Sequence, residues 1–196
     1  MKVAVRLLAL PLALLGTTTL AAQETGRGVV FQVFAGGATH LRNLNATGSV
    51  AHFQPGFNLG GAIGFQASDY FGLHGDFTYT RNQARGASSF SGSNIDRFFY
   101  GAHMEFSYPT ESGFAPFAFG GGGAVTIHQA GPTGTLPTFT KPAAMFGAGF
   151  RYQFAKTPVE VLVEGKSLVY QWDRGGFSRT QWDVSYSAGL AYRLGF

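Results

Sequence analysis

The chain has no cysteine and few charged residues. None of its 196 residues is Cys, and Asp, Glu, Lys and Arg together make up only 12%. The absence of cysteine excludes disulfides and thiolate metal sites, so packing and strand closure have to stabilise the fold. Without Lys2 and Arg6, the chain has 12 basic and 10 acidic residues. The resulting net charge of +2 gives little support to nucleic-acid binding.

A hydrophobic run long enough to cross a membrane as a helix is also missing. The N-terminal run "LLALPLALL", residues 7–15, is too short and is interrupted by proline. It follows Lys2 and Arg6 and precedes the small residues of "TTTLAA", an order that is typical of a secretory signal peptide. We therefore predict a cleaved signal peptide at residues 1–22 and one domain at residues 23–196.

The chain is instead rich in Gly and Phe, with 29 and 20 copies, and its apolar residues recur at every second position. In "QWDVSYSAGLAYRLGF", residues 181–196, apolar side chains fall on one face and polar ones on the other. This period of two predicts a β-strand, because a helix would scatter the same residues around its axis. The same pattern predicts eight strands, at residues 28–37, 56–67, 70–80, 96–108, 114–127, 144–154, 159–170 and 181–196.

The links between these segments alternate in length. "QASD", "PTESG" and "AKTP" are short, whereas residues 38–55, 81–95, 128–140 and 171–180 form long polar links. Short turns at one end and long loops at the other are characteristic of outer-membrane barrels. We therefore predict an all-β fold, an eight-stranded antiparallel up-and-down transmembrane β-barrel with both termini on the side of the short turns.

The two faces of the strands predict an inside and an outside. Eight strands leave a narrow interior, so we expect the large aromatic side chains to face lipid and the small and charged ones to face inward. Because a lone buried charge is costly, we expect the inward charges, including Glu160, to pair with one another. In the strand predicted at residues 159–170, Leu162 and Leu168 share the inward face with charged residues, although large apolar side chains are expected outside. We therefore predict a β-bulge in this strand or an error in its predicted boundaries. The predicted interior polar network consists of His74, Asp76, Arg97, His103, Glu105, Arg151, Glu164, Lys166, Asp183 and Arg193.

The chain ends on Phe196, preceded at alternate positions by Leu194, Tyr192, Leu190 and Ala188. With this ending, the sequence resembles the small bacterial outer-membrane β-barrels of the OmpA-like and OmpX-like kind over the whole of residues 23–196. The resemblance implies a monomer in the bacterial outer membrane, surrounded by lipid and lipopolysaccharide, with periplasmic termini and extracellular long loops. It also implies that Tyr192, Leu194 and Phe196 form a signal read by the barrel-assembly machinery.

No residue pattern points to an enzyme. Lipid A deacylases of this architecture carry serine two positions after a histidine, and none of the five histidines here is followed in this way. Palmitoyl-transferring barrels use His, Asp and Ser near the extracellular rim. The adjacent pair Ser68–Asp69 lies instead in a predicted periplasmic turn. We therefore predict no catalytic residue and no cofactor. His74 with Asp76, and His103 with Glu105, are suitable metal ligands on neighbouring strands. A hydrogen-bonded filling of the barrel is the favoured interpretation, so no metal site is predicted.

The long loops carry five arginines, which predict a basic extracellular rim. Arginine binds phosphate groups well, so this rim suits the phosphates of lipopolysaccharide, and solvated loop charges are the alternative. The expected function is a structural or surface-interaction role, in adhesion or envelope integrity. The alternatives are a narrow channel or small-ligand carrier, and a lipid-modifying outer-membrane enzyme. The predicted rim consists of Arg42, Arg81, Arg85, Arg174 and Arg179.

Overall fold

The structure is a computed structural model that describes residues 27–41, 52–85, 91–130, 136–155, 157–173 and 178–195. The signal peptide predicted at residues 1–22 lies outside the described residues. In the part of the chain that is described, there is no helix of the length and hydropathy needed to cross a membrane. The strands of this part are β1 (Gly28–His40), β2 (His52–Phe53), β3 (Gly56–Ser68), β4 (Phe71–Arg85), β5 (Asn94–Ser107), β6 (Phe114–Ala130), β7 (Leu136–Gln153), β8 (Val159–Trp172) and β9 (Arg179–Gly195).

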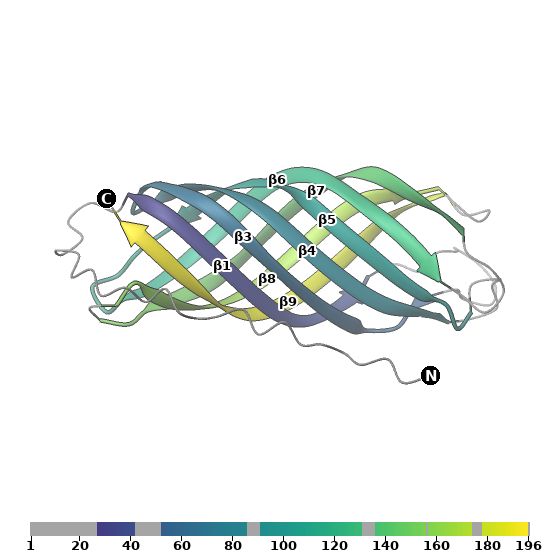
Figure 1. The fold of residues 1–196 in the computed structure, drawn as a ribbon, viewed down its shortest axis with the longest axis horizontal. Helices are drawn as coiled ribbons and strands as arrows, with labels where there is room; N and C mark the ends of the chain where they lie inside the picture. Colours follow the sequence, from purple (N-terminus) through teal and green to yellow (C-terminus); the bar gives the residue numbers. More distant parts are fainter. Residues whose placement is uncertain are drawn as a thin grey trace, which may run out of the picture.

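The eight long strands form a closed antiparallel barrel. β1 pairs with both β3 and β9, and the ring is completed by the pairing of β4 with β5. Each long strand therefore has two partners, and none presents a free edge. Figure 1 shows the strands tilted around an elongated barrel, with the start of β1 beside the end of β9. The predicted fold class, a closed eight-stranded antiparallel barrel, is confirmed.

The barrel has two different ends. The turn end contains the short connections at residues 69–70, 108–113 and 154–158, together with the start of β1 and the end of β9. At the opposite end, which we call the loop end, β1, β4, β6 and β8 finish. The short strand β2 lies at the loop end and, among the described residues, pairs with the last two residues of β4.

At the loop end the strands run further than the apolar pattern predicts. β4 continues to Arg85, and β6 and β7 leave only residues 131–135 between them, so the long loop predicted at residues 128–140 is wrong. The extended part of this hairpin carries polar side chains on its outward face, where the hydroxyls of Thr126 and Thr140 lie 2.8 Å apart. Such polar cross-strand pairs also stabilise a sheet, and an apolar alternation does not reveal them.

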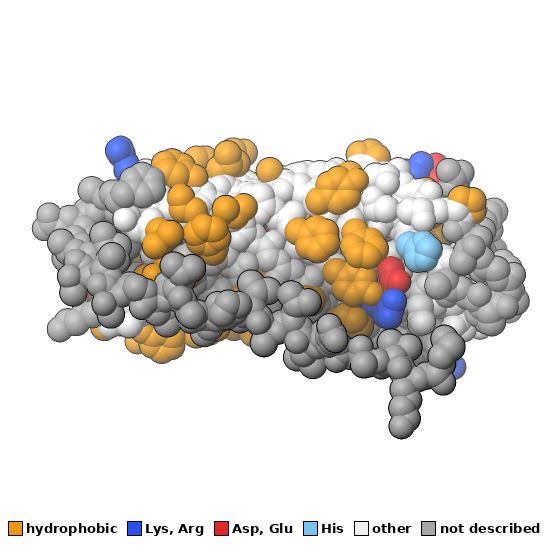
Figure 2. All heavy atoms as spheres, in the orientation of Figure 1, with side chains coloured by type: hydrophobic (Ala, Val, Ile, Leu, Met, Phe, Trp, Pro, Cys, Tyr) orange, Lys and Arg blue, Asp and Glu red, His pale blue; other side chains and the backbone are white. Residues whose placement is uncertain are grey.

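The outer surface is apolar, as expected for a barrel that faces lipid. Large hydrophobic side chains stand exposed along the strands, among them Leu190 at 52% and Phe146 at 44%. Figure 2 shows that on one face they gather in two zones, one towards each end of the barrel. Eight rings of the described residues are nevertheless buried; the prediction that the large rings of the strands face outward is wrong for five of them, and Phe53, Phe139 and Trp172 lie in segments predicted to be polar links. The buried rings are Phe34, Phe53, Phe99, Phe117, Phe119, Phe139, Tyr170 and Trp172.

Glycine on neighbouring strands makes room for several of these inward rings. A Cβ atom built on Gly60 would lie 2.5 Å from the ring of Phe34. A Cβ atom on Gly147 would likewise lie 2.4 Å from the ring of Phe119. The narrow interior therefore accommodates aromatic rings because the facing positions carry no side chain.

Strand β8 contains no irregularity. Its register with β7 and β9 is continuous, so the bulge or boundary error predicted there is wrong. Leu162 and Leu168 are 1% and 9% exposed and lie inside the barrel, on the same face as Lys166. Leu162 packs in a small buried cluster with Val30 and Phe34. The interior accepts these leucines because it contains apolar clusters beside its charges.

Candidate functional site in the barrel interior

Charged side chains are stacked inside the barrel in three layers along its axis. Nine of the ten residues of the predicted polar network are buried, and the side chain of Arg193 is 15% exposed. The layers contain more residues than the sequence pattern suggested. The turn-end layer consists of Glu105, Arg151, Glu160 and Arg193, the middle layer of Asp76, Glu164 and Lys166, and the loop-end layer of His40, Arg97, Tyr170 and Asp183.

In the turn-end layer, two arginines share two glutamates. Nη2 of Arg151 donates a hydrogen bond to Oε2 of Glu105 at 2.6 Å, and Nε of Arg151 lies 3.4 Å from Glu160. Arg193 approaches Glu160 to 2.9 Å. A cavity of about 100 Å³ opens beside these arginines at the turn end. This layer therefore borders a cavity at the turn end of the barrel.

In the middle layer, one lysine spans the barrel. Nζ of Lys166 lies 2.6 Å from Asp76 and 3.5 Å from Glu164. Asp76 also accepts a hydrogen bond of 2.9 Å from Thr78. Lys166 is on β8 and Asp76 is on β4, and these strands are four places apart around the ring of eight. The ion pair therefore crosses the interior and obstructs it.

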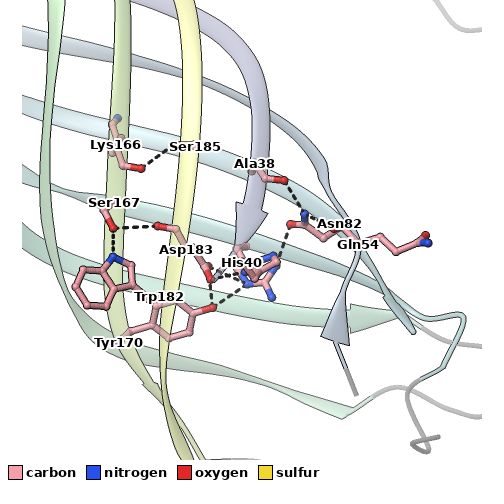
Figure 3. A network of polar contacts seen from close by, with 11 residues as sticks. Ala38, His40, Gln54, Asn82, Lys166, Ser167, Tyr170, Trp182, Asp183 and Ser185 are labelled. Atoms are coloured by element: carbon pink, nitrogen blue, oxygen red, sulfur yellow. Dashed lines mark hydrogen bonds and ion pairs between the residues drawn. The ribbon is translucent and has the colours of Figure 1, made fainter. Parts of the chain in front are cut away.

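The loop-end layer is built around the carboxylate of Asp183 (Figure 3). Nδ1 of His40 forms a short hydrogen bond with one of its oxygens, and the hydroxyl of Tyr170 donates to the other at 2.9 Å. Nε of Arg97 lies 3.5 Å from the same carboxylate and donates to the hydroxyl of Tyr170 at 2.9 Å. Nη1 of Arg97 donates to Asn82 at 3.1 Å. Because β5 and β9 are also four places apart around the ring, this layer forms a second cross-brace.

Each layer contains a cation that lies over the face of an inward phenylalanine. A cation above an aromatic ring is attracted by the electron density of the ring, and burial strengthens this attraction. The inward rings that the sequence analysis missed therefore also stabilise the charges. The distances from the cation to the ring centroid are 4.6 Å for Arg151 over Phe117, 4.4 Å for Lys166 over Phe34 and 4.5 Å for Arg97 over Phe53.

The two buried histidines considered as metal ligands lie side by side between the turn-end and middle layers. The rings of His74 and His103 are parallel, with centroids 5.2 Å apart. The neighbouring carboxylates of Asp76 and Glu105 are directed to Lys166 and Arg151. Within the described ranges, no group of three or more His, Asp and Glu side chains has the arrangement needed to hold a metal ion.

Around and beyond the loop-end layer, buried apolar side chains form a cluster that we call the apolar plug. Phe53 enters this plug from β2, although it belongs to a segment that was predicted to be a polar loop. The sequence signal that could have revealed the plug is the presence of isolated aromatic residues in otherwise polar links, such as Phe53 and Phe139. The plug includes Phe53, Ile95, Ile127, Phe139, Met145 and Trp172, all of which are buried.

The described residues of the predicted basic rim lie in strands and not in loops. Arg81 is on the outward face of β4, where its guanidinium donates to both oxygens of Asp96 at 2.6 and 2.9 Å. Arg85 ends β4, and Arg179 begins β9. Arg42 and Arg174 lie outside the described residues. The prediction that Arg81, Arg85 and Arg179 are loop residues is therefore wrong, because β4 and β9 extend beyond their apolar segments.

The residues of the predicted assembly signal lie on the outer surface, as far as they are described. Tyr192 and Leu194 are 37% and 40% exposed near the end of β9. Phe196 lies outside the described residues. The two described residues pair with β1 across the closure of the barrel, where Tyr192 is opposite Phe31 and Leu194 is opposite Val29.

Comparisons with known proteins identify the fold. No protein-family model matches the chain, and no curated protein sequence matches it. The structure is similar to that of the Neisserial surface protein A (NspA), with a TM-score of 0.63 and 16% identity over 85% of this chain and 97% of that one. It is also similar to the outer membrane protein OprG from Pseudomonas aeruginosa, with a TM-score of 0.62 and 15% identity over 89% of this chain and 100% of that one. The chain thus has the fold of the small eight-stranded outer-membrane β-barrels.

Proposed function

We propose that the chain is an integral protein of a bacterial outer membrane with a structural or surface-interaction role. The observation that carries this proposal is the reversed polarity of the barrel, which is apolar outside and charged inside. A soluble barrel of this size has the opposite arrangement, because its outer surface meets water. The two similar structures are described as a surface protein and an outer membrane protein, and these descriptions support the proposed location.

The packed interior favours a structural role over a channel. Lys166 and Arg97 cross the barrel at two levels, and apolar side chains fill the space beyond them towards the loop end. The space next to Arg97 and Asp183 measures only about 10 Å³, which is about the minimum that one water molecule needs. An ion would therefore meet an obstructed path, so we infer that the resting barrel does not conduct.

The loop end is the surface that we propose to act outside the cell. In this orientation the turn end and both termini are periplasmic. Arg81, Arg85 and Arg179 of the predicted rim lie near the loop end, and arginine pairs well with the phosphates of lipopolysaccharide. Arg81 is paired with Asp96, so a phosphate group would compete with this carboxylate for its guanidinium.

We further propose that the protein is a monomer that inserts with the help of the barrel-assembly machinery. Tyr192 and Leu194 expose their side chains on the outer surface at the closing strand, and Phe196 continues the same alternation in the sequence. Deletion of Phe196 should then reduce the amount of protein in the outer membrane much more than it reduces refolding in detergent. Equal losses in both assays would contradict the signal.

The experiment that tests the proposed role combines location, conductance and phenotype. Membrane fractionation should place the protein in the outer membrane, where unboiled and boiled samples should migrate differently on a denaturing gel. Purified protein in planar bilayers should give no reproducible conductance, whereas steady channels would favour the alternative function. A deletion strain should show changed adhesion or detergent sensitivity with unchanged lipid A, and changed lipid A acylation would instead favour a lipid-modifying enzyme.

A further inference from the structure

The short strand β2 places the side chain of Phe53 inside the barrel. Within the described residues, β2 consists of His52 and Phe53, which pair with Arg85 and Ala84 of β4. The next residue, Gln54, is held through its backbone by Gln83 and by the side chain of Asn82, at 2.8 and 2.9 Å. Phe53 is nevertheless only 5% exposed. The ring carried by this two-residue strand therefore fills part of the interior at the loop end.

The surroundings of Phe53 are those of a binding site for an aromatic ring. Its ring centroid lies 4.7 Å from that of His40 and 5.7 Å from that of Trp172. The guanidinium of Arg97 lies 4.5 Å from the centre of the same ring. Trp172 is supported from another side by Phe139, at 5.3 Å in an edge-to-face arrangement. Aromatic walls with a guanidinium on one side bind a planar aromatic group well.

Phe53 satisfies the apolar part of this site but leaves two polar atoms without partners. Nη2 of Arg97 and Nε2 of His40 are both buried and make no hydrogen bond. The side chains themselves are almost fully buried, at 3% exposure for Arg97 and 1% for His40. Buried polar atoms without partners are costly, and phenylalanine has no atom that could bond to them.

The hydrogen bonds of the loop-end layer specify what would satisfy both atoms. Nδ1 of His40 bonds to the carboxylate of Asp183, so in a neutral ring the proton lies on Nδ1 and Nε2 is an acceptor. Nη2 of Arg97 can only donate. A hydroxyl group on an aromatic ring would accept from Arg97 and donate to His40. Both residues contact the carboxylate of Asp183 and the ring of Phe53, so they border the same space.

We propose that the space beneath β2 is a binding site for a small phenol, which enters by displacing Phe53. The phenol ring takes the place of the Phe53 ring between Arg97, His40 and Trp172, and its hydroxyl satisfies the two unpartnered nitrogens. In the absence of ligand, Phe53 fills the site and keeps the barrel mouth dry. This ligand site goes beyond the structural role proposed above and does not depend on it.

The two tryptophans of the chain allow a direct test in lipid nanodiscs. Trp172 contacts Phe53, whereas Trp182 lies on the outer side of β9 against Phe146. In the Trp182→Phe variant, the fluorescence of Trp172 should change saturably as 4-methylphenol is added. In the Trp172→Phe variant, Trp182 should report only non-saturable partitioning of the phenol into lipid.

Two further probes separate recognition of the hydroxyl from recognition of the ring. Toluene has the same ring but no hydroxyl group, and benzoate carries two acceptor oxygens and no donor for His40. We expect both to bind at least about tenfold more weakly than 4-methylphenol, because each leaves one or both nitrogens unpartnered. Equal affinity for toluene and 4-methylphenol would overturn the proposed role of Arg97 and His40.

Two changes at β2 test the displacement of Phe53. Phe53→Ala removes the competing ring and should tighten the affinity for 4-methylphenol by about tenfold or more. In a protein without native cysteine, the pair His52→Cys and Arg85→Cys can lock β2 onto β4, since these residues are directly paired. The oxidised form should lose the Trp172 response, and reduction should restore it. Saturable binding that persists in the locked form, or no saturable binding to unlocked wild type, would overturn the proposal.

Discussion

The two halves of the barrel interior are built according to different rules. Towards the turn end, the interior contains ion pairs, a cavity that opens at that end, and the histidines His74 and His103, whose Nδ1 atoms make no hydrogen bond. Around and beyond Arg97 and Asp183, towards the loop end, the interior contains the buried side chains of Ile127, Met145 and Trp172, packed as in the core of a soluble protein. The turn-end half thus keeps the charged interior common in membrane barrels beside the small apolar cluster of Val30, Phe34 and Leu162, whereas apolar side chains fill much of the loop-end half.

The two halves of the interior make the barrel rigid in different ways. Ion pairs inside a barrel maintain its cross-section but contribute little net free energy, because both partners lose hydration on burial. An apolar plug stabilises by excluding water, and it tolerates less volume change because it is tightly packed. We therefore expect the turn-end half to be sensitive to loss of charge and the loop-end half to be sensitive to loss of volume.

The largest effect should follow from breaking the brace of the middle layer. Lys166→Met leaves Asp76 and Glu164 without their cation, and an uncompensated buried charge of this kind costs about 3 to 5 kcal/mol. The measurement is urea unfolding in lipid vesicles. Lys166→Arg retains the charge and should lose much less stability. A Lys166→Met variant as stable as wild type would show that this ion pair does not stabilise the barrel.

A slightly smaller effect should follow from a cavity in the apolar plug. Met145 is 1% exposed, and Met145→Ala should cost about 2 to 5 kcal/mol because the packed neighbours close the cavity only in part. The same unfolding assay measures it. Met104 is the matched control, since it is 50% exposed on the outer surface and its truncation leaves no internal cavity. Equal losses for Met145→Ala and Met104→Ala would contradict a packed plug.

The sequence predicts the barrel well because each strand alternates for most of its length. It also predicts which charges face inward, since their positions follow from parity once a strand has been recognised. It does not predict the plug, because Phe53 and Phe139 lie in segments whose neighbours are polar. His40 was missed for a related reason, as β1 continues three residues beyond its apolar pattern. The sequence also does not predict contacts between residues far apart in the chain, such as Arg97 and Tyr170. These contacts depend on where each strand lies around the barrel, and a local sequence pattern does not contain that information.

On the outer surface, unlike in the interior, the loss of stability caused by a new charge should depend on its depth in the membrane. Leu190→Arg and Phe146→Arg place a charge in the proposed lipid contact and should each cost about 2 to 4 kcal/mol. Thr138 is exposed near the loop end of β7, so Thr138→Arg should cost less than about 1 kcal/mol. Refolding into vesicles followed by urea unfolding gives these values. Similar costs at Thr138 and Leu190 would mean that the apolar band is not the lipid contact.

The smallest effect should come from an ion pair of the same chemistry as the brace but in a different environment. Lys141 pairs with Asp173 near the loop end, and their side chains are 23% and 38% exposed, compared with 1% and 2% for Lys166 and Asp76.

Because water already solvates the exposed pair, Lys141→Gln should cost about 1 kcal/mol or less. The difference from wild type should shrink further when salt is added, since mobile ions screen exposed charges and reach buried ones poorly. The effect of Lys166→Met should therefore persist in high salt while that of Lys141→Gln disappears. If the two costs respond to salt in the same way, water and ions reach the middle layer, and the barrel is open where we have described it as braced.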